Sequence, residues 1–193
     1  MNTPTPNRID KLNQLTTPLL EWYSSAARDL PWRTPASETH RPDPYHVWVS
    51  EIMLQQTRVE AVKAYYARFL TAFPNIKSLA NAPQDELMKL WQGLGYYSRA
   101  NNLKRAAIEI EERFHGEFPR TYQEILSLPG IGEYTAGAIA SIALGEAVPA
   151  IDGNVYRIYT RLFEDDSDIT KAAFKKQLRS ELLQTIPPGT PGI

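Results

Sequence analysis

The sequence contains no cysteine among its 193 residues. A chain without cysteine forms no disulfide, binds no metal through thiolates, carries no cysteine-ligated iron–sulfur cluster and has no cysteine nucleophile. Histidine is almost as scarce, and the three that are present, His40, His46 and His115, are scattered without the spacing of a metal-ligand pair. The composition therefore predicts no metal site in this chain.

Long hydrophobic runs and an excess of one charge are also missing. The longest nearly apolar stretch, Ala136 to Leu144, is far too short to cross a bilayer, and the N-terminal MNTPTPNRIDK has no apolar signal core. The 21 basic residues nearly balance the 22 acidic ones, for a net charge of −1. This balance argues against a nonspecific polyanion binder, but not against a DNA enzyme with a local basic face. We expect a soluble cytoplasmic protein that contacts no membrane.

What is present is a helical pattern along the whole chain. No strand-length run of alternating apolar and polar residues is bounded by hairpin signals. Thr17-Pro18 and Asp43-Pro44 each place an N-cap residue before a proline at the first helical position. The sequence predicts an all-α fold with helices over residues 18–27, 44–56, 59–73, 83–93, 97–114, 121–127, 134–144, 153–162 and 170–185.

A cationic run lies close to aromatic residues in the segment 97–114, where Arg99, Lys104 and Arg105 follow Tyr96 and Tyr97. Such a run is most often a solvated helix face, although it can also contact a phosphate backbone. Both interpretations remain open from the residues alone.

The segment Leu128-Pro129-Gly130-Ile131-Gly132 separates two helical patterns. Proline ends the first helix, and the two glycines permit positive φ and a close backbone approach. The free N–H groups of such a turn, at the start of the next helix, form a phosphate-binding device. Glycine can also occur between two helices only because the turn that joins them is tight, with no ligand bound. The small residues that follow, from Ala136 to Ser141, favour a helix-hairpin-helix DNA motif.

Two carboxylates stand out from the other acidic residues. Glu51 lies in the middle of an apolar helix, where burial would raise its pKa and suit it to general acid catalysis. A glutamate that forms a salt bridge, or whose side chain extends so that the carboxylate reaches solvent, is the commoner case. Asp152 begins a helix after an apolar approach, so it is an N-cap at least. A carboxylate held there can also stabilise a developing cationic sugar.

The sequence resembles the MutY-type adenine DNA glycosylases, within the endonuclease III superfamily of helix-hairpin-helix base-excision enzymes. The resemblance covers most of residues 20–165 in the family's order and spacing. It rests on the motifs LPWR (30–33), VWVSEIMLQQT (47–57), LWQGLGYYSRANNL (90–103), LPGIGEYTAGAI (128–139) and IDGNVYRI (151–158).

The resemblance implies a catalytic role for four residues. Glu51 matches the glutamate that protonates N7 of adenine and handles the attacking water, and Asp152 matches the carboxylate that stabilises the oxocarbenium-like sugar. Asn154 matches an amide beside the sugar and phosphate. Tyr134 takes the place of the Schiff-base lysine of bifunctional relatives, and because a phenol cannot form that imine, we expect a monofunctional glycosylase.

Further matches imply DNA contacts. Gln56 and Tyr96 correspond to residues that wedge into the duplex as the base is flipped. Trp32, Arg33 and Leu54 correspond to the wall of the adenine pocket, with Gln55 in the same motif. The residues expected to bind DNA through the hairpin are Leu128, Gly130, Ile131, Gly132 and Thr135.

The resemblance also divides the chain and exposes departures from the family. We expect an N-terminal tail (1–17), an N-terminal helix and loop on the side of the second subdomain (18–43), a six-helix barrel (44–145) with the helix-hairpin-helix motif at 121–144, C-terminal helices of a truncated second subdomain (146–186) and a linker-like tail (187–193). The family's four-cysteine loop is missing, so its 4Fe-4S cluster is expected only in a full-length parent protein. We interpret the chain as a fragment.

These expectations define one main hypothesis and two alternatives. The main hypothesis is a monomeric, nucleoid-associated enzyme of bacterial type that removes adenine from A:8-oxoguanine or A:G mispairs in double-stranded DNA. One alternative is a related thymine or oxidised-pyrimidine glycosylase, against which Tyr134 and the motif around Glu51 argue. The other is a DNA-binding remnant with little catalysis.

Overall fold

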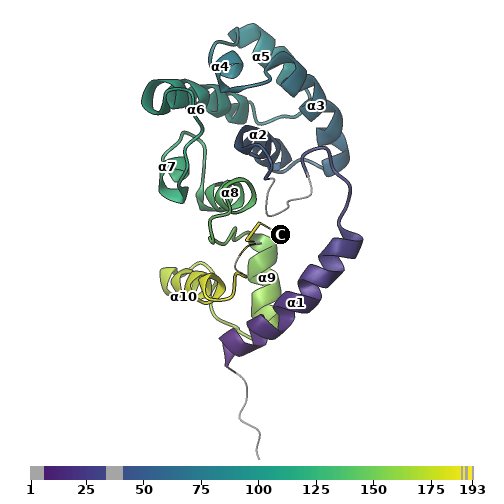
Figure 1. The fold of residues 1–193 in the computed structure, drawn as a ribbon, viewed down its shortest axis with the longest axis vertical. Helices are drawn as coiled ribbons and strands as arrows, with labels where there is room; N and C mark the ends of the chain where they lie inside the picture. The colour runs from purple at the N-terminus through teal and green to yellow at the C-terminus, as the bar shows by residue number, and fades with distance from the viewer. Residues whose placement is uncertain (1–6, 34–40, 188, 190, 193) are drawn as a thin grey trace, which may run out of the picture.

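The computed structural model describes residues 7–33, 41–187, 189, 191 and 192, and within these residues every regular element is a helix. The all-α prediction is therefore confirmed (Figure 1). The elements in chain order are α1 (Arg8–Ala26), α2 (Pro44–Leu54), α3 (Val59–Ala72), α4 (Ile76–Ala80), α5 (Gln84–Trp91), α6 (Ser98–Phe114), α7 (Tyr122–Leu126), α8 (Glu133–Ile139), the π-helical turn η1 (Ala140–Leu144), α9 (Gly153–Leu162) and α10 (Ala172–Leu183).

Local capping signals explain where several helices begin. The Asp43 side chain accepts a hydrogen bond from the Tyr45 backbone N–H, and Pro44 opens α2 as predicted. Thr121 and Glu124 form a reciprocal capping box at the start of α7. Asp152 caps α9 by accepting from two backbone N–H groups. Each of these starts depends on residues within one turn of chain, which is why the sequence predicts them well.

The prediction of an N-terminal tail over residues 1–17 is wrong for the described residues, because α1 begins at Arg8 with Asn7 as its N-cap. Pro18 lies inside this helix and not at its first turn. An interior proline costs about 3 kcal/mol of helix stability. Residues of the first two turns contact distant parts of the chain: Arg8 pairs with Asp165, and the Lys11 ammonium donates to the Leu162 carbonyl at 2.8 Å.

The main hydrophobic core surrounds α2, whose residues Val49 and Met53 are fully buried. The helix packs against α3, α6 and α8, and Figure 1 shows it enclosed by these elements. Because α2 is surrounded on most faces, its apolar residues run almost continuously along the sequence. This burial fixes the position of Glu51, which lies on the same helix.

A smaller core joins helices from the two ends of the chain. Tyr159 of α9 packs with Phe174 and Leu178 of α10, and Leu12 of α1 lies against them. In Figure 1, α1 runs alongside α9. The described part of the chain thus has one large core and one small core, and α9 leaves the small core with its N-terminus directed at the large one.

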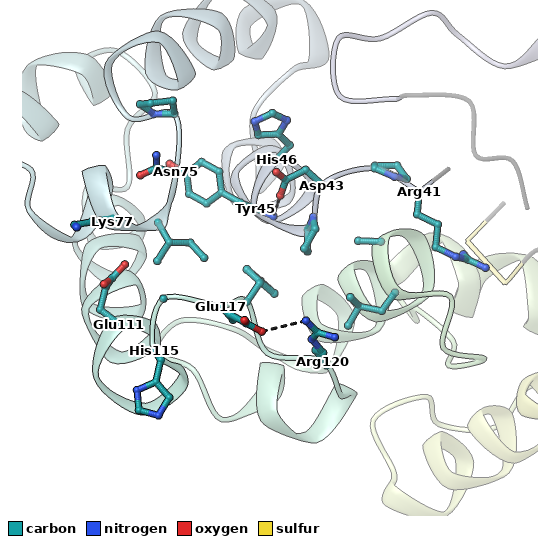
Figure 2. Close-up of a pocket in the computed structure, with 18 residues that line it drawn as sticks. Arg41, Asp43, Tyr45, His46, Asn75, Lys77, Glu111, His115, Glu117 and Arg120 are labelled. Atoms are coloured by element: carbon teal, nitrogen blue, oxygen red, sulfur yellow. Dashed lines mark hydrogen bonds and ion pairs between the residues drawn. The ribbon is translucent and has the colours of Figure 1, made fainter. Parts of the chain in front are cut away.

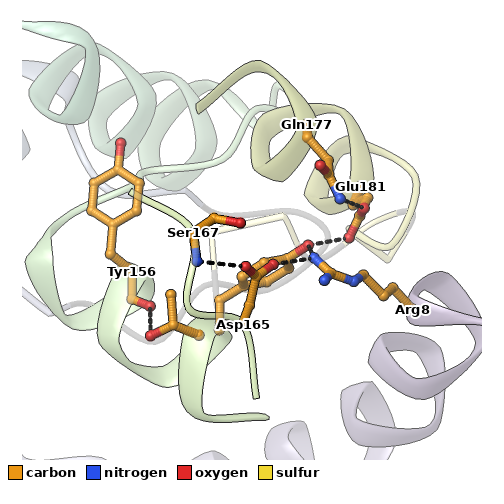
Figure 3. A network of polar contacts seen from close by, with 8 residues as sticks. Arg8, Tyr156, Asp165, Ser167, Gln177 and Glu181 are labelled. Atoms are coloured by element: carbon orange, nitrogen blue, oxygen red, sulfur yellow. Dashed lines mark hydrogen bonds and ion pairs between the residues drawn. The ribbon is translucent and has the colours of Figure 1, made fainter. Parts of the chain in front are cut away.

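A polar network locks the small core together (Figure 3). The Arg8 guanidinium donates to the Tyr159 hydroxyl at 2.8 Å and pairs with Asp165 at 2.7 Å. The Tyr159 hydroxyl in turn donates to Glu181 at 2.5 Å, and the Gln177 amide donates to the same carboxylate at 2.9 Å. Arg8 therefore links α1 to Tyr159 of α9 directly and to Glu181 of α10 through the Tyr159 hydroxyl.

Candidate active site

A cavity of about 1210 Å³ lies between α2, α8, η1 and the segment that leads into α9. It brings together residues that are far apart in sequence, and among them are six of the predicted site residues. These six are Trp32, Arg33, Glu51, Leu54, Tyr134 and Asp152.

Glu51 faces this cavity from α2 and is partly buried. Burial is the largest influence on its carboxyl group and raises its pKa, as expected for a carboxyl on an apolar helix. The Tyr134 hydroxyl, as a hydrogen-bond donor, and the positive charge of Arg33 act in the opposite direction. A carboxyl with a raised pKa keeps a proton to a higher pH, which is the property that a general acid needs.

Tyr134 lies in the first turn of α8, opposite Glu51. Its pKa is raised first by burial and then by the negative charges of Glu51 and Asp152. The phenol therefore stays neutral over the physiological range and acts as a donor. Glu51, Tyr134 and Asp152 all line the same cavity and therefore belong to a single site.

Asp152 is held rigidly by the start of α9. One of its carboxylate oxygens accepts the backbone N–H groups of Asn154 and Val155, both at 2.9 Å, and the other accepts the Asn154 side-chain amide at 2.8 Å. Asn154 is exposed and does not line the cavity, so its described role is to orient Asp152. The N-cap and active-site interpretations of Asp152 are compatible in this geometry.

The segment before Asp152 lies directly on α8. An added Cβ at Gly137 would come within 2.6 Å of the Pro149 carbonyl oxygen, a contact that only glycine permits. In the sequence, Gly137 is one of the small residues that favour the helix-hairpin-helix motif, and in the structure it admits this segment of the same chain. The close approach fixes the backbone just before Asp152 against α8, the helix that carries Tyr134.

The pocket-wall residues differ in exposure. Trp32 is buried, with its ring edge against Tyr66 at a centroid distance of 5.4 Å. The Arg33 guanidinium lies 5.6 Å from the Tyr23 ring centroid. Leu54 and Gln55 are both half-buried at the end of α2. On the opposite side, Pro191 and Gly192 line the cavity, so these described residues of the expected linker-like tail pack on the fold.

The predicted hairpin forms between α7 and α8, but its two glycines differ. Gly130 has φ of +77°, and its backbone lies tightly against Asn102 of α6. Gly132 is extended, with φ of −98°, and it caps α8 without a side-chain hydrogen bond, with open space where a Cβ would be. The expectation of positive φ is therefore met at Gly130 only, while Gly132 leaves room for a close approach from outside.

Three other residues expected at this DNA interface have buried side chains, namely Leu128, Ile131 and Thr135. They anchor the turn to the core and leave little of their surface accessible to a ligand. The Thr135 hydroxyl also accepts a long hydrogen bond of 3.5 Å from the Gln55 amide.

Gln56 and Tyr96 are both exposed, as a wedge requires, and Tyr96 has 63% of its surface accessible. Both have left-handed backbones, with φ of +55° and +46°. The residue that sequence reasoning missed is Arg99, which belongs to the cationic run yet is only 8% exposed. No periodicity signal distinguishes it from Lys104 or Arg105, because its burial depends in part on the end of α2, which lies 44 to 47 residues away in the sequence.

A second cavity, of about 1260 Å³, opens at the other end of α2, and Figure 2 shows its labelled side chains. Its walls carry mixed charges, including the exposed ion pair between Glu117 and Arg120. None of the predicted catalytic residues lines it. The catalytic chemistry is therefore assigned to the cavity that holds Glu51.

Over residues 7–33, 41–187, 189, 191 and 192, no three histidine, aspartate or glutamate side chains gather as a metal site would need. The sequence also lacks the cysteines that an iron–sulfur cluster requires. The residues present do not fit such a cluster, and no step below passes through one. Among the same described residues, no helix is both long enough and apolar enough to span a membrane.

Comparisons with known proteins identify the family to which the chain is similar. The family model described as "HhH-GPD superfamily base excision DNA repair protein" matches residues 49–184. The adenine DNA glycosylases of Mus musculus and Homo sapiens are each 44% identical over 177 residues, which is 90% of this chain but 34% and 32% of those proteins. The chain thus spans about one third of the length of these relatives.

Solved structures show the same fold. A thermostable thymine-DNA glycosylase aligns with a TM-score of 0.82 and 26% identity, covering 96% of this chain and 83% of that one. A non-covalent endonuclease III–DNA complex aligns with a TM-score of 0.71 and 21% identity, covering 94% of this chain and 80% of that one.

Proposed function

Because the chain belongs to the HhH-GPD superfamily of base excision DNA repair proteins, we propose that it is the catalytic part of a monofunctional adenine DNA glycosylase. Its substrate is genomic double-stranded DNA in which adenine is mispaired with 8-oxoguanine or guanine. The observation that carries this proposal is the convergence of Glu51, Tyr134 and Asp152 on one cavity.

In the proposed reaction the protonated Glu51 donates its proton to N7 of the extruded adenine. The bond between C1′ and N9 then breaks, its electron pair leaves with the purine, and positive charge develops on the sugar. The fixed carboxylate of Asp152 stabilises that charge. Water attacks C1′ and passes a proton to the Glu51 carboxylate, which restores the acid.

Two features support hydrolysis without strand cleavage. A lyase needs an amine that attacks C1′ to form an imine, and the side chain facing Glu51 is the phenol of Tyr134. The raised pKa of that phenol keeps it protonated, so it is a poor nucleophile. Tyr134 instead donates toward Glu51 and stabilises the carboxylate formed after proton transfer.

The hairpin and the exposed turns provide the DNA face in this proposal. The N–H groups that follow Gly132 are uncapped by side chains and begin a helix, which suits a backbone phosphate. Gln56 and Tyr96 project from neighbouring turns and fill the space left by the extruded base. The adenine DNA glycosylases of mouse and human align with 90% of this chain.

A thymine glycosylase is the second candidate, because a thymine-DNA glycosylase is the structure with the TM-score of 0.82. The higher identity to adenine glycosylases favours adenine. Both candidates share the fold, so the choice depends on the base that the cavity accepts.

The test is single-turnover base release, with protein in excess over duplexes that carry A:8-oxoguanine, A:G, A:T or T:G. We expect adenine release from the first two duplexes, fastest with 8-oxoguanine, and no release by Glu51→Gln although that variant still binds DNA. Release of thymine from T:G alone would replace the proposal with the second candidate. Binding without release of any base would identify a DNA-binding remnant.

A further inference from the structure

Outside the catalytic cavity, the most unusual group is the guanidinium of Arg99 in the first turn of α6. It is 8% exposed, and no carboxylate in the described residues forms an ion pair with it. Its Nε atom has no hydrogen-bond partner among those residues. Burying a cation without a counter-charge is costly, so the contacts that it does make need an explanation.

All the hydrogen bonds that the Arg99 side chain donates to the backbone go to carbonyl groups of two turns. Nη1 donates to the carbonyls of Ile52, Met53 and Gln55, at 2.7, 3.1 and 2.7 Å, where α2 ends. Nη2 donates to the carbonyls of Leu94 and Gly95, at 3.0 and 3.3 Å, in the turn before α6. One side chain thus holds two turns that lie about forty residues apart in the sequence.

Each of these turns carries one of the exposed side chains described above. The carbonyl of Gln55 belongs to the peptide unit that precedes Gln56, and the carbonyl of Gly95 belongs to the one that precedes Tyr96. Fixing the orientation of a peptide unit restrains φ of the following residue. Both following residues have positive φ, a conformation that costs free energy for any residue except glycine and persists only when the surroundings enforce it.

We propose that Arg99 is a positioning residue that holds Gln56 and Tyr96 at a fixed separation, as one rigid wedge, and thereby promotes extrusion of the target base. The proposal rests on the proposed function. A wedge inserts productively only if it is rigid before binding, because ordering it on the DNA would consume binding free energy. The Arg99 guanidinium also lies 5.7 Å from the ring centroid of Tyr96, which restrains the ring itself.

Lysine cannot replace this arginine in the proposed role. The guanidinium is a planar fork whose two terminal nitrogens each serve one turn, whereas a lysine ammonium is a single point with three donors. Arg99→Lys keeps the charge and loses the bridge. It is therefore the variant that separates positioning from simple charge.

The first measurement follows extrusion directly. A duplex with 2-aminopurine at the target position, opposite 8-oxoguanine, is saturated with Glu51→Gln protein, which leaves the base attached. We expect the fluorescence gain on binding to fall strongly when Arg99→Lys is added. Tyr45→Phe, which removes a buried hydrogen bond to the Phe73 carbonyl at the other end of α2, is the control of similar structural cost and should leave the gain unchanged.

The second measurement is a double-mutant cycle on single-turnover adenine release. We expect Arg99→Lys to reduce release about tenfold or more in the otherwise unchanged protein. In a Gln56→Ala/Tyr96→Ala background, which has no wedge, the same substitution should cost little. An equal loss in both backgrounds, or an undiminished fluorescence gain, would overturn the proposal. If the unchanged chain releases no adenine, the proposed function fails, and the fluorescence measurement still decides the role of Arg99.

Discussion

Replacing Gly137 with alanine tests how the position of Asp152 is set. The added Cβ would lie 2.6 Å from the Pro149 carbonyl oxygen, 3.1 Å from its carbon and 3.2 Å from Cα of Ala150. All three neighbours are backbone atoms, so no flexible side chain can move aside. Restoring an ordinary contact of about 3.4 Å requires the segment to move away from α8 by roughly 0.8 Å.

We expect this displacement to reach the Asp152 carboxylate, the proposed stabiliser of the sugar. Asp152 follows Ala150 by two residues, and its side chain is fixed to the start of α9 by three donors. A misplacement of about 1 Å can cost on the order of 100-fold in rate. We therefore expect Gly137→Ala to lower single-turnover adenine release by roughly 10- to 100-fold.

Stability should respond less than activity. Alanine is favoured over glycine inside a helix by up to about 1 kcal/mol, which offsets part of the strain from the new contact. The control is Gly153→Ala, which adds the same methyl group beside Asp152 but into open space. Thermal melts and release rates of both variants are compared with the unchanged chain. If Gly137→Ala releases adenine at the unchanged rate, the close packing of α8 does not determine the position of Asp152.

Three further predictions concern other parts of the molecule. Because burial raises the pKa of Glu51 above its ordinary value of 4.5, the folded state binds the proton more tightly than the unfolded chain, and ionisation destabilises the fold as pH rises through the raised pKa. Glu51→Gln should therefore melt at a higher temperature than the unchanged chain at neutral and alkaline pH, with the difference closing toward pH 4; a difference independent of pH would contradict this. Tyr134→Lys places an amine at the same site, so borohydride should trap a covalent adduct between this variant and DNA. The unchanged chain should form no such adduct, and an equally strong adduct with it would refute the monofunctional assignment. Arg8→Met removes the links from α1 to Asp165 and Tyr159, so amide hydrogen exchange should become faster in the first turns of α1 and stay unchanged in α2, whereas Arg28→Met, at an exposed position, should change neither.

The helix starts that the sequence predicts correctly are those that depend on a few adjacent residues. Asp43-Pro44 and Asp152 each satisfy the first N–H groups of their own helix, so no distant contact is needed. Thr17-Pro18 presents the same local signal, yet the helix begins at Arg8 and runs through it, and Arg8 and Lys11 contact residues that lie far away in the sequence. The short helix α4 is not among the predicted helices, although Asn75 and Ser78 form a capping box at its start, whereas α7, of equal length, is predicted.

Arg99 shows a second limit of sequence reasoning. In the sequence it is one of three basic residues in a helical segment, and its neighbours Lys104 and Arg105 share its charge. Its burial follows from the carbonyl groups of two turns that meet only in the folded chain. A residue that acts on backbone atoms leaves no pattern of complementary side chains, so neither charge nor spacing reveals it.

The active site combines both kinds of determinant. The environment of Glu51 is a property of α2, and the capping of Asp152 is a property of α9, so the sequence could predict each carboxylate separately. Their proximity is a property of neither helix, because it depends on α8, which carries Tyr134 on one turn and admits the Pro149 backbone at Gly137 on the next. A residue without a side chain therefore brings the two carboxylates to the same cavity, and substitutions on this face of α8 should affect catalysis before they affect the fold.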